Sequence, residues 1–157
     1  MTAAKDLLDA FRDYLAARAA DLPERFVAGL SDDIPERPLA PRRLPCLRHL
    51  DRIADAAEID ELRLARVLGD RRDQLTWGQT YGAADFGSDF LDNYGWVELI
   101  GTRGHFASEV VAAGFLLLGP QTHYPDHHHV AEEGYIPLTG GTAWSKGGGA
   151  PVPRAAG

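Results

Sequence analysis

Apolar residues recur at helical spacing through the first part of the chain. In residues 3–20 they form one stripe opposite a charged face, which predicts an amphipathic helix that buries this stripe. The stripe consists of Leu7, Leu8, Phe11, Tyr14 and Leu15. A second, shorter helical pattern covers residues 24–30. The chain should therefore begin with packing helices.

A proline-rich segment follows these helices. Its prolines remove backbone donors and break regular structure, so we expect an extended connection. They are Pro35, Pro38, Pro41 and Pro45. Helical spacing then returns at 47–57 and at 62–68, and Gly69 is expected to end the second of these helices.

The pattern changes after residue 76. Aromatic residues and glycines dominate 77–96, and the segments 96–100 and 107–118 have strand character. Turn signals at 102–104, 119–120 and 140–141 suggest an antiparallel β region, and the tail from Lys146 offers almost nothing to bury. We predict a mainly β protein with a helical N-terminal extension at 1–76 and a β domain at 77–157.

Composition limits the classes of partner. The 157 residues, 45% hydrophobic and 25% charged, are typical of one soluble globular domain. A net charge of -7, with acidic and basic residues interleaved, argues against nucleic acid or a membrane surface as partner. The single cysteine, Cys46, excludes an internal disulfide, and the first twenty residues lack a signal-peptide pattern, so we expect a cytoplasmic location.

Candidate metal ligands gather between His123 and Tyr135, in the run HYPDHHHVAEEGY. Imidazole combined with carboxylate suits one divalent ion such as zinc, iron, manganese or nickel. Alternate residues of an extended chain share a face, so His127 and His129 can face the same ion. Glu133 and Tyr135 are also an even number of residues from His127, so they could share this face if the following strand keeps its register. The alternative is a solvated histidine turn that picks up metal adventitiously.

The spacing of these ligands resembles the first conserved motif of the cupin superfamily. Its members are small β-barrels of the double-stranded β-helix or jelly-roll type. The matching pattern is His127-x-His129-x-x-x-Glu133, with Gly140 further along. The resemblance implies that two histidines and a glutamate hold a metal near the barrel mouth. In cupins a fourth ligand, a histidine, comes from a second motif.

The flanking motifs narrow the resemblance to the cupin-type dimethylsulfoniopropionate (DMSP) lyases, which split DMSP into dimethyl sulfide and acrylate. It covers residues 77–144 well and the helical extension loosely. The motifs are Trp77-Gly-Gln-Thr-Tyr81, Phe90-Leu-Asp-Asn-Tyr-Gly-Trp96, Gly114-Phe-Leu-Leu-Leu-Gly-Pro120, Tyr124-Pro and Ala131-Glu-Glu133.

The resemblance implies a role for each matching residue. The metal ligands would be His129, Glu133 and Tyr135, with His127 either a fourth ligand or beside the ion. Tyr135 would be the base and Tyr124 a second catalytic tyrosine, and the sequence does not rank one above the other.

The implied substrate is a small sulfonium carboxylate. Aromatic faces can hold its cation, and Trp77 and Tyr81 are the preferred pocket residues because they lie on the family's motif. The other aromatic candidates are Phe86, Phe90, Tyr94 and Trp96.

The sequence departs from the family pattern after residues 147–151. The family continues into strands that carry the second motif, whereas no histidine follows His129 here. We therefore expect a C-terminally truncated cupin with an open strand edge, which could form homo-oligomers. Two alternatives to the lyase follow: a weak or inactive metal-binding cupin (a pseudoenzyme or small-molecule binder), and a cupin isomerase or dioxygenase acting on another carboxylate.

Overall fold

The computed structural model describes residues 2–18, 22–30, 33–127 and 130–157. The helices and 3₁₀ turns are α1 (Ala3–Ala16), α2 (Glu24–Gly29), η2 (Pro45–Leu50), α3 (Ile53–Ala56), α4 (Leu62–Arg71), η3 (Arg72–Gln74) and α5 (Ala83–Leu91). The strands are β1 (Tyr94–Gly101), β2 (Phe106–Ala107), β3 (Ala113–Leu118), β4 (Thr142–Trp144) and β5 (Val152–Arg154).

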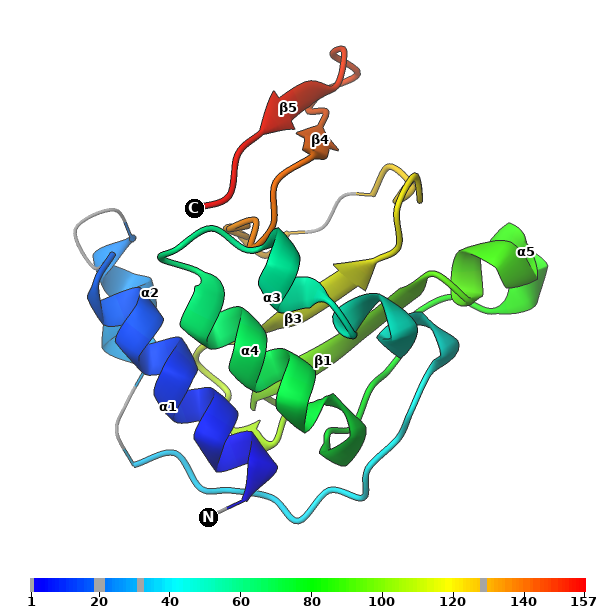
Figure 1. Cartoon of the computed structure of the whole chain (residues 1–157). Coiled ribbons are helices and arrows are strands. Elements are labelled where there is room, and N and C mark those ends of the chain that lie inside the picture. The colour runs from blue at the N-terminus through cyan, green and yellow to red at the C-terminus, as the bar shows by residue number, and fades with distance from the viewer. Residues whose placement is uncertain (1, 19–21, 31–32, 128–129) are drawn as a thin grey trace.

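Helices α1 and α4 lie side by side over the sheet (Figure 1). The Thr2 hydroxyl caps α1 by accepting a hydrogen bond from the Lys5 amide at 3.1 Å. The apolar stripe predicted for this helix is buried, and the Phe11 ring meets the edge of Phe115 on β3 at 5.8 Å between centroids. The prediction of a packing helix at the start of the chain is thus confirmed, as is the short helix α2.

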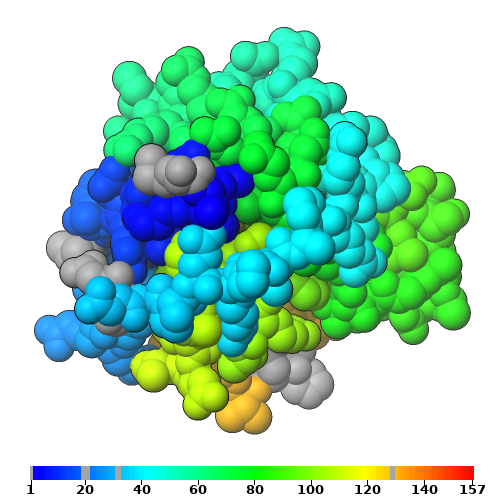
Figure 2. All heavy atoms as spheres, turned by 90° about the horizontal axis from the view of Figure 1, so that it is seen from below, coloured from blue at the N-terminus to red at the C-terminus, as the bar shows by residue number. Residues whose placement is uncertain are grey.

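The proline-rich segment is extended, as expected. Its backbone pairs with the loop around β2, where the Arg37 amide donates to the His105 carbonyl at 2.7 Å and the Ala107 amide to the Pro35 carbonyl at 2.9 Å. Figure 2 shows the segment lying across this end of the sheet. It therefore covers backbone that would otherwise face water.

Two details of the helical prediction are wrong. The pattern at 47–57 forms a 3₁₀ turn and a short helix instead of one helix, and α4 runs through Gly69 to Arg71. A Cβ on Gly69 would lie 3.2 Å from both Ile53 Cγ2 and the Leu50 carbonyl oxygen. The glycine therefore serves close packing between helices and does not end the helix.

The sheet has the order β2-β1-β3, with β1 antiparallel to β3 and parallel to the very short β2. A register shift interrupts the β1–β3 pairing between Glu98 and Ile100. Both strands predicted at 96–100 and 107–118 are present, the second in its C-terminal half. Strands β4 and β5 form a separate antiparallel hairpin, so the tail carries a short exposed strand that the composition did not predict.

The expectation of a mainly β chain is not confirmed, because helical residues outnumber strand residues in the described ranges. Between β3 and β4 the described residues form no strand. Prolines at 120, 125 and 137 cannot donate to a ladder, which accounts for this. One buried cluster contains side chains from α1, α4, β1 and β3. The division of the chain at residue 76 into a helical extension and a β domain stays a prediction. None of the described helices has the length and apolarity needed to cross a membrane.

Candidate active site

Helix α5 supplies two aromatic rings to one side of the candidate site. Its first turn is closed by Asp85, whose carboxylate accepts a hydrogen bond from the Gly82 amide at 2.8 Å. Gly87 has φ +79°, a conformation that favours glycine, and it kinks the helix between Phe86 and Phe90. Phe86 remains 43% exposed. Sequence patterns did not predict this helix, because the glycine and the adjoining aromatics obscure its period.

Five aromatic side chains form one cluster, which we call the aromatic cluster. Its members are Tyr81, Phe86, Phe90, Tyr94 and Tyr124. Phe90 stacks on Tyr94 with 4.8 Å between centroids, and Tyr81 meets the edge of Phe86 at 4.8 Å. Tyr94 is completely buried at the start of β1 and lies 5.5 Å from Tyr124. The cluster joins segments separated by about forty residues.

Tyr124 is the member closest to the predicted metal motif. Its pKa is raised far above the ordinary value of 10.0, first by burial and then by hydrogen bonds to Tyr94 and Tyr81. The edge of the His127 ring packs against it at 4.9 Å, and His127 Nδ1 lies 3.1 Å from the Pro125 carbonyl oxygen. A neutral phenol therefore stands beside an exposed imidazole.

Tyr135 and Glu133 are joined directly by a hydrogen bond between their side chains. The Tyr135 hydroxyl donates to Glu133 Oε2 at 2.5 Å, and its ring lies 4.8 Å from that of Trp144 on β4. Burial, the hydrogen bond to Glu133 and the charge of that carboxylate all raise the pKa of Tyr135. In this state the phenol keeps its proton and donates it in the hydrogen bond to the carboxylate.

The complete metal site cannot be assembled from the described residues. His129 lies outside the described ranges, and within those ranges no three His, Cys, Asp or Glu side chains gather closely enough to hold an ion. The donor types nevertheless fit a divalent first-row metal, since a carboxylate and a phenol oxygen already meet at Glu133 and Tyr135 with His127 in the same segment. The predicted ligand set stays a prediction.

The two predicted pocket residues differ in their surroundings. Tyr81 belongs to the aromatic cluster. Trp77 is completely buried in the core, where its indole Nε1 donates to the Arg72 carbonyl at 2.9 Å. In this structure the Trp77 ring therefore has no surface available to a ligand, which corrects our placement of it in the pocket. His105 is also structural, because its Nε2 accepts from the Thr76 amide at 3.1 Å.

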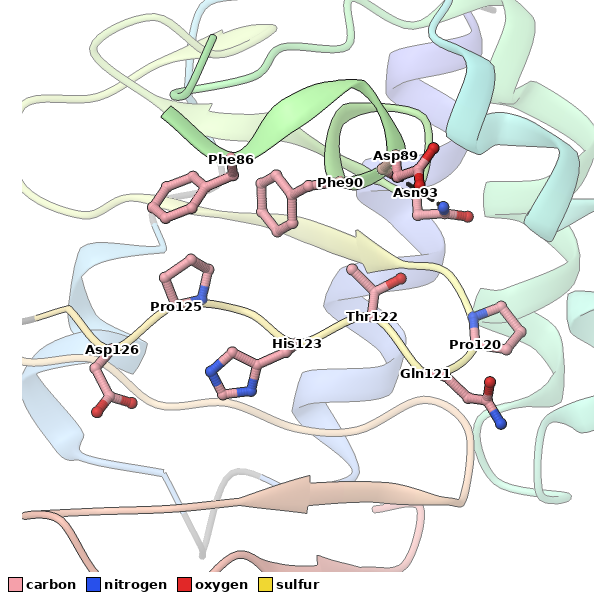
Figure 3. A pocket seen from close by; sticks show the side chains of 10 residues that line it. All are labelled: Phe86, Asp89, Phe90, Asn93, Pro120, Gln121, Thr122, His123, Pro125 and Asp126. Carbon is pink, nitrogen blue, oxygen red and sulfur yellow. Dashed lines mark hydrogen bonds between the residues drawn. The ribbon is translucent and has the colours of Figure 1, made fainter. Parts of the chain in front are cut away.

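A cavity of about 700 Å³ opens beside the aromatic cluster. Figure 3 shows Phe86 and Phe90 projecting from α5 toward the segment that follows β3. The residues that line the cavity are Phe86, Asp89, Phe90, Asn93, Pro120, Gln121, Thr122, His123, Pro125 and Asp126. The volume is in the range of about 300–1,000 Å³ that small-molecule sites occupy. We did not predict Asp89, Asn93 or Asp126 as site residues.

Asn93 fixes the inner end of this cavity. Its Oδ1 accepts from His49 Nε2 at 2.8 Å and from Arg48 Nη2 at 3.0 Å, and its Nδ2 donates to the Asp89 carbonyl at 2.8 Å. Its own carbonyl accepts from the Gly119 amide at 2.7 Å. One side chain thus ties η2 and the end of α5 together where β3 ends.

Charge distribution is the sequence signal that could have pointed to this region. Between Arg72 and Lys146 the only Lys or Arg is Arg103, while nine residues are acidic. These are Asp73, Asp85, Asp89, Asp92, Glu98, Glu109, Asp126, Glu132 and Glu133. Arg103 is itself engaged, 3.5 Å from Glu98 and 5.3 Å from the Trp96 ring centroid. The part of the chain that builds the site is therefore strongly anionic.

Comparisons with known proteins place the chain in the dimethylsulfoniopropionate lyase family. Residues 19–157 match the family model described as dimethylsulfoniopropionate lyase. The chain is 36% identical over 112 residues to the putative dimethylsulfoniopropionate lyase DddL of Cereibacter sphaeroides, covering 68% of this chain and 45% of that protein. It is 33% identical over 137 residues to the dimethylsulfoniopropionate lyase DddQ of Ruegeria pomeroyi, covering 83% and 67% respectively.

A comparison with solved structures also finds similarity to DMSP lyases. The chain resembles a protein chain from the work described as crystal structures of the DMSP lyases RdDddP and RnDddQII, with a TM-score of 0.56 and 31% sequence identity. The match covers 69% of this chain and 54% of the solved one. The chain thus spans between about half and two thirds of the length of these relatives.

Proposed function

Because the chain belongs to the cupin-type dimethylsulfoniopropionate lyase family, we propose that it cleaves DMSP by β-elimination. A base removes a proton from the carbon next to the carboxylate, and the electron pair of that C–H bond forms the double bond of acrylate. The C–S bond breaks and its electron pair leaves with sulfur as neutral dimethyl sulfide. We also propose that the strands belong to a cupin barrel that follows the helical extension.

The observation that carries this proposal is the direct contact between Tyr135 and Glu133. A phenol is a poor base at neutral pH, and here burial and the Glu133 carboxylate raise its pKa further. Positive charge beside Glu133 would neutralise the carboxylate and reverse its effect on the phenol. Tyr135 then becomes a base whose proton acceptor atom, Oη, is already positioned by the neighbouring carboxylate.

A divalent ion is the natural source of that positive charge. We propose that His127, His129, Glu133 and Tyr135 hold it, and it would supply a Lewis acid for the substrate carboxylate. The charge distribution supports this requirement, because the only Lys or Arg between residues 73 and 145, Arg103, is bound to Glu98. The substrate carboxylate would otherwise enter a region of like charge.

Tyr124 is the second candidate for the base. It belongs to the aromatic cluster and also contacts His127, so it can meet both the cationic part of a substrate and the predicted metal motif. Its raised pKa favours the neutral form, in which the hydroxyl donates a hydrogen bond. We propose that Tyr124 orients the substrate while Tyr135 takes the proton.

Variants of the two tyrosines test these roles. We expect Tyr135→Phe to lower acrylate release from DMSP by about 10²–10⁴-fold, the usual contribution of a general base. Tyr124→Phe should raise KM more than it lowers kcat, and Tyr14→Phe, which removes a phenol that donates to Glu61 and lies outside the aromatic cluster, is the matched control. An unchanged rate in Tyr135→Phe would remove it as the base.

Two further measurements separate the lyase from its alternatives, the binding module and the dioxygenase. Substrate that binds to folded, metal-loaded chain without turnover would identify a binding module instead of a lyase. Oxygen consumption with a carboxylate substrate would identify a dioxygenase.

A further inference from the structure

We propose that the cavity beside α5 is a subsite for methylated onium groups, which accepts trimethylammonium as well as dimethylsulfonium. This inference rests on the proposed function, because it assigns the cationic end of that substrate to the cavity. It extends the ligand class from sulfonium compounds to quaternary ammonium carboxylates.

Two phenyl rings give the cavity the surface that such cations prefer. Phe86 and Phe90 project into it from α5, one turn apart, and their centroids are 5.3 Å from each other (Figure 3). No residue of α5 is buried, and Phe86 keeps 43% of its surface exposed. Ring faces attract methylated cations through the quadrupole, and aromatic walls are the usual means of binding quaternary ammonium groups.

The charged groups around the cavity favour a cation over a neutral ligand. Asp89 and Asp126 belong to its lining, and among the described lining residues there is no Lys or Arg. Arg48 reaches the inner end from η2, but it is bound to the Oδ1 of Asn93 and to the Pro45 carbonyl. His123 is the remaining titratable group of the lining. An anionic group would meet repulsion here unless it were paired with a metal.

The cavity also adjoins Tyr124, to which we assign orientation of the substrate, and Tyr124 contacts His127. Phe90 is stacked with Tyr124 at 6.5 Å between centroids and with Tyr94 at 4.8 Å, and Tyr124 contacts His127. A ligand whose cationic end lies against Phe86 and Phe90 can therefore extend its other end toward Tyr124 and the predicted metal ligands. The cavity and the reacting residues are two ends of one site.

Neither the ring faces nor the two carboxylates distinguish sulfur from nitrogen at the centre of the cation. Both groups present methyls with spread positive charge, and both lack an N–H donor that would require a specific acceptor. Trimethylammonium carboxylates should therefore bind in the cavity. Trimethylamine is a poorer leaving group than dimethyl sulfide, so these compounds should inhibit the elimination competitively.

Binding of tetramethylammonium to the metal-free chain tests the subsite without requiring catalysis. We expect saturable chemical-shift changes by NMR with tetramethylammonium chloride, and much weaker ones with tert-butanol, which has a similar shape and no charge. Phe86→Leu should weaken binding about 2- to 30-fold, the range that cation–π contacts span. Asp89→Asn should weaken it about 5-fold, because a nearby unit charge in water contributes about 1 kcal/mol. Asp55→Asn, an exposed carboxylate on α3 that pairs with Arg52, is the matched control.

The outcomes of this experiment are separable from those of the lyase assay. Equal binding of tert-butanol and tetramethylammonium, unchanged affinity in both cavity variants, or no binding at all would overturn the subsite. If tetramethylammonium binds as expected while folded, metal-loaded chain releases no acrylate, the lyase proposal fails and the onium site stands. If acrylate is released and the KM for DMSP is unchanged in Phe86→Leu and Asp89→Asn, the onium subsite fails and the lyase proposal stands.

Discussion

Replacing Trp77 by Phe separates a core role from a ligand-binding role for this residue. An aromatic side chain of this kind buries about 150–250 Å², which at about 25 cal/mol per Å² corresponds to about 4–6 kcal/mol. Trp77 is completely buried and its indole N–H donates to the Arg72 carbonyl. Phe retains most of the apolar contact but loses this hydrogen bond, worth about 1 kcal/mol, and leaves space where the second ring was.

We therefore expect Trp77→Phe to lower the free energy of unfolding by about 2–3 kcal/mol, measured by urea denaturation with circular dichroism as the probe. Trp96→Phe is the matched control. The Trp96 ring is only partly buried and donates to Thr80 Oγ1 at 3.0 Å, so its loss should cost about 1 kcal/mol. Equal stability of Trp77→Phe and the wild-type chain, together with a raised KM for DMSP, would refute the core assignment.

Two further predictions concern titratable groups in the core. Burial lowers the pKa of His105 below 6.5, so the stability that neutral His105 provides is present above this pH and is lost as the pH falls. Denaturation midpoints should therefore decrease between pH 7 and pH 5, and less so in His105→Gln, which can still accept from Thr76. Burial raises the pKa of Cys46 to about 11 from 9.0, so its stabilising contribution falls as the pH rises through this interval. At pH 8 the folded chain should resist iodoacetamide, and rapid alkylation under native conditions would contradict the buried position.

Elements with a regular period could be predicted from the sequence. Helix α1 keeps a single apolar stripe through four turns, and strands β1 and β3 carry runs of apolar residues that end at recognisable turns. Helix α5 could not be predicted in this way, since none of its residues is buried and Gly87 interrupts it. Its two phenylalanines, Phe86 and Phe90, face the cavity and the aromatic cluster, so their spacing carries no core signal.

The candidate site was predictable where neighbours in sequence are also neighbours in space. Glu133 and Tyr135 are two residues apart and are joined by a hydrogen bond, while their role as metal ligands stays a prediction. The cavity was not predictable, because its walls come from residues 86–93 and 120–126, which only the tertiary fold brings together. Trp77 illustrates the remaining limit, since a position on a family motif does not state whether the side chain faces a ligand or the core.

The fate of the substrate is the most direct test of the proposed elimination. Metal-loaded chain should be incubated with DMSP deuterated at the carbon next to the carboxylate, with added manganese, iron, nickel or zinc and a chelated control, and followed by NMR. We predict equal amounts of dimethyl sulfide and acrylate, the acrylate having lost one of the two deuterons, and no product in the chelated sample. Folded, metal-loaded chain that leaves the substrate intact would contradict it.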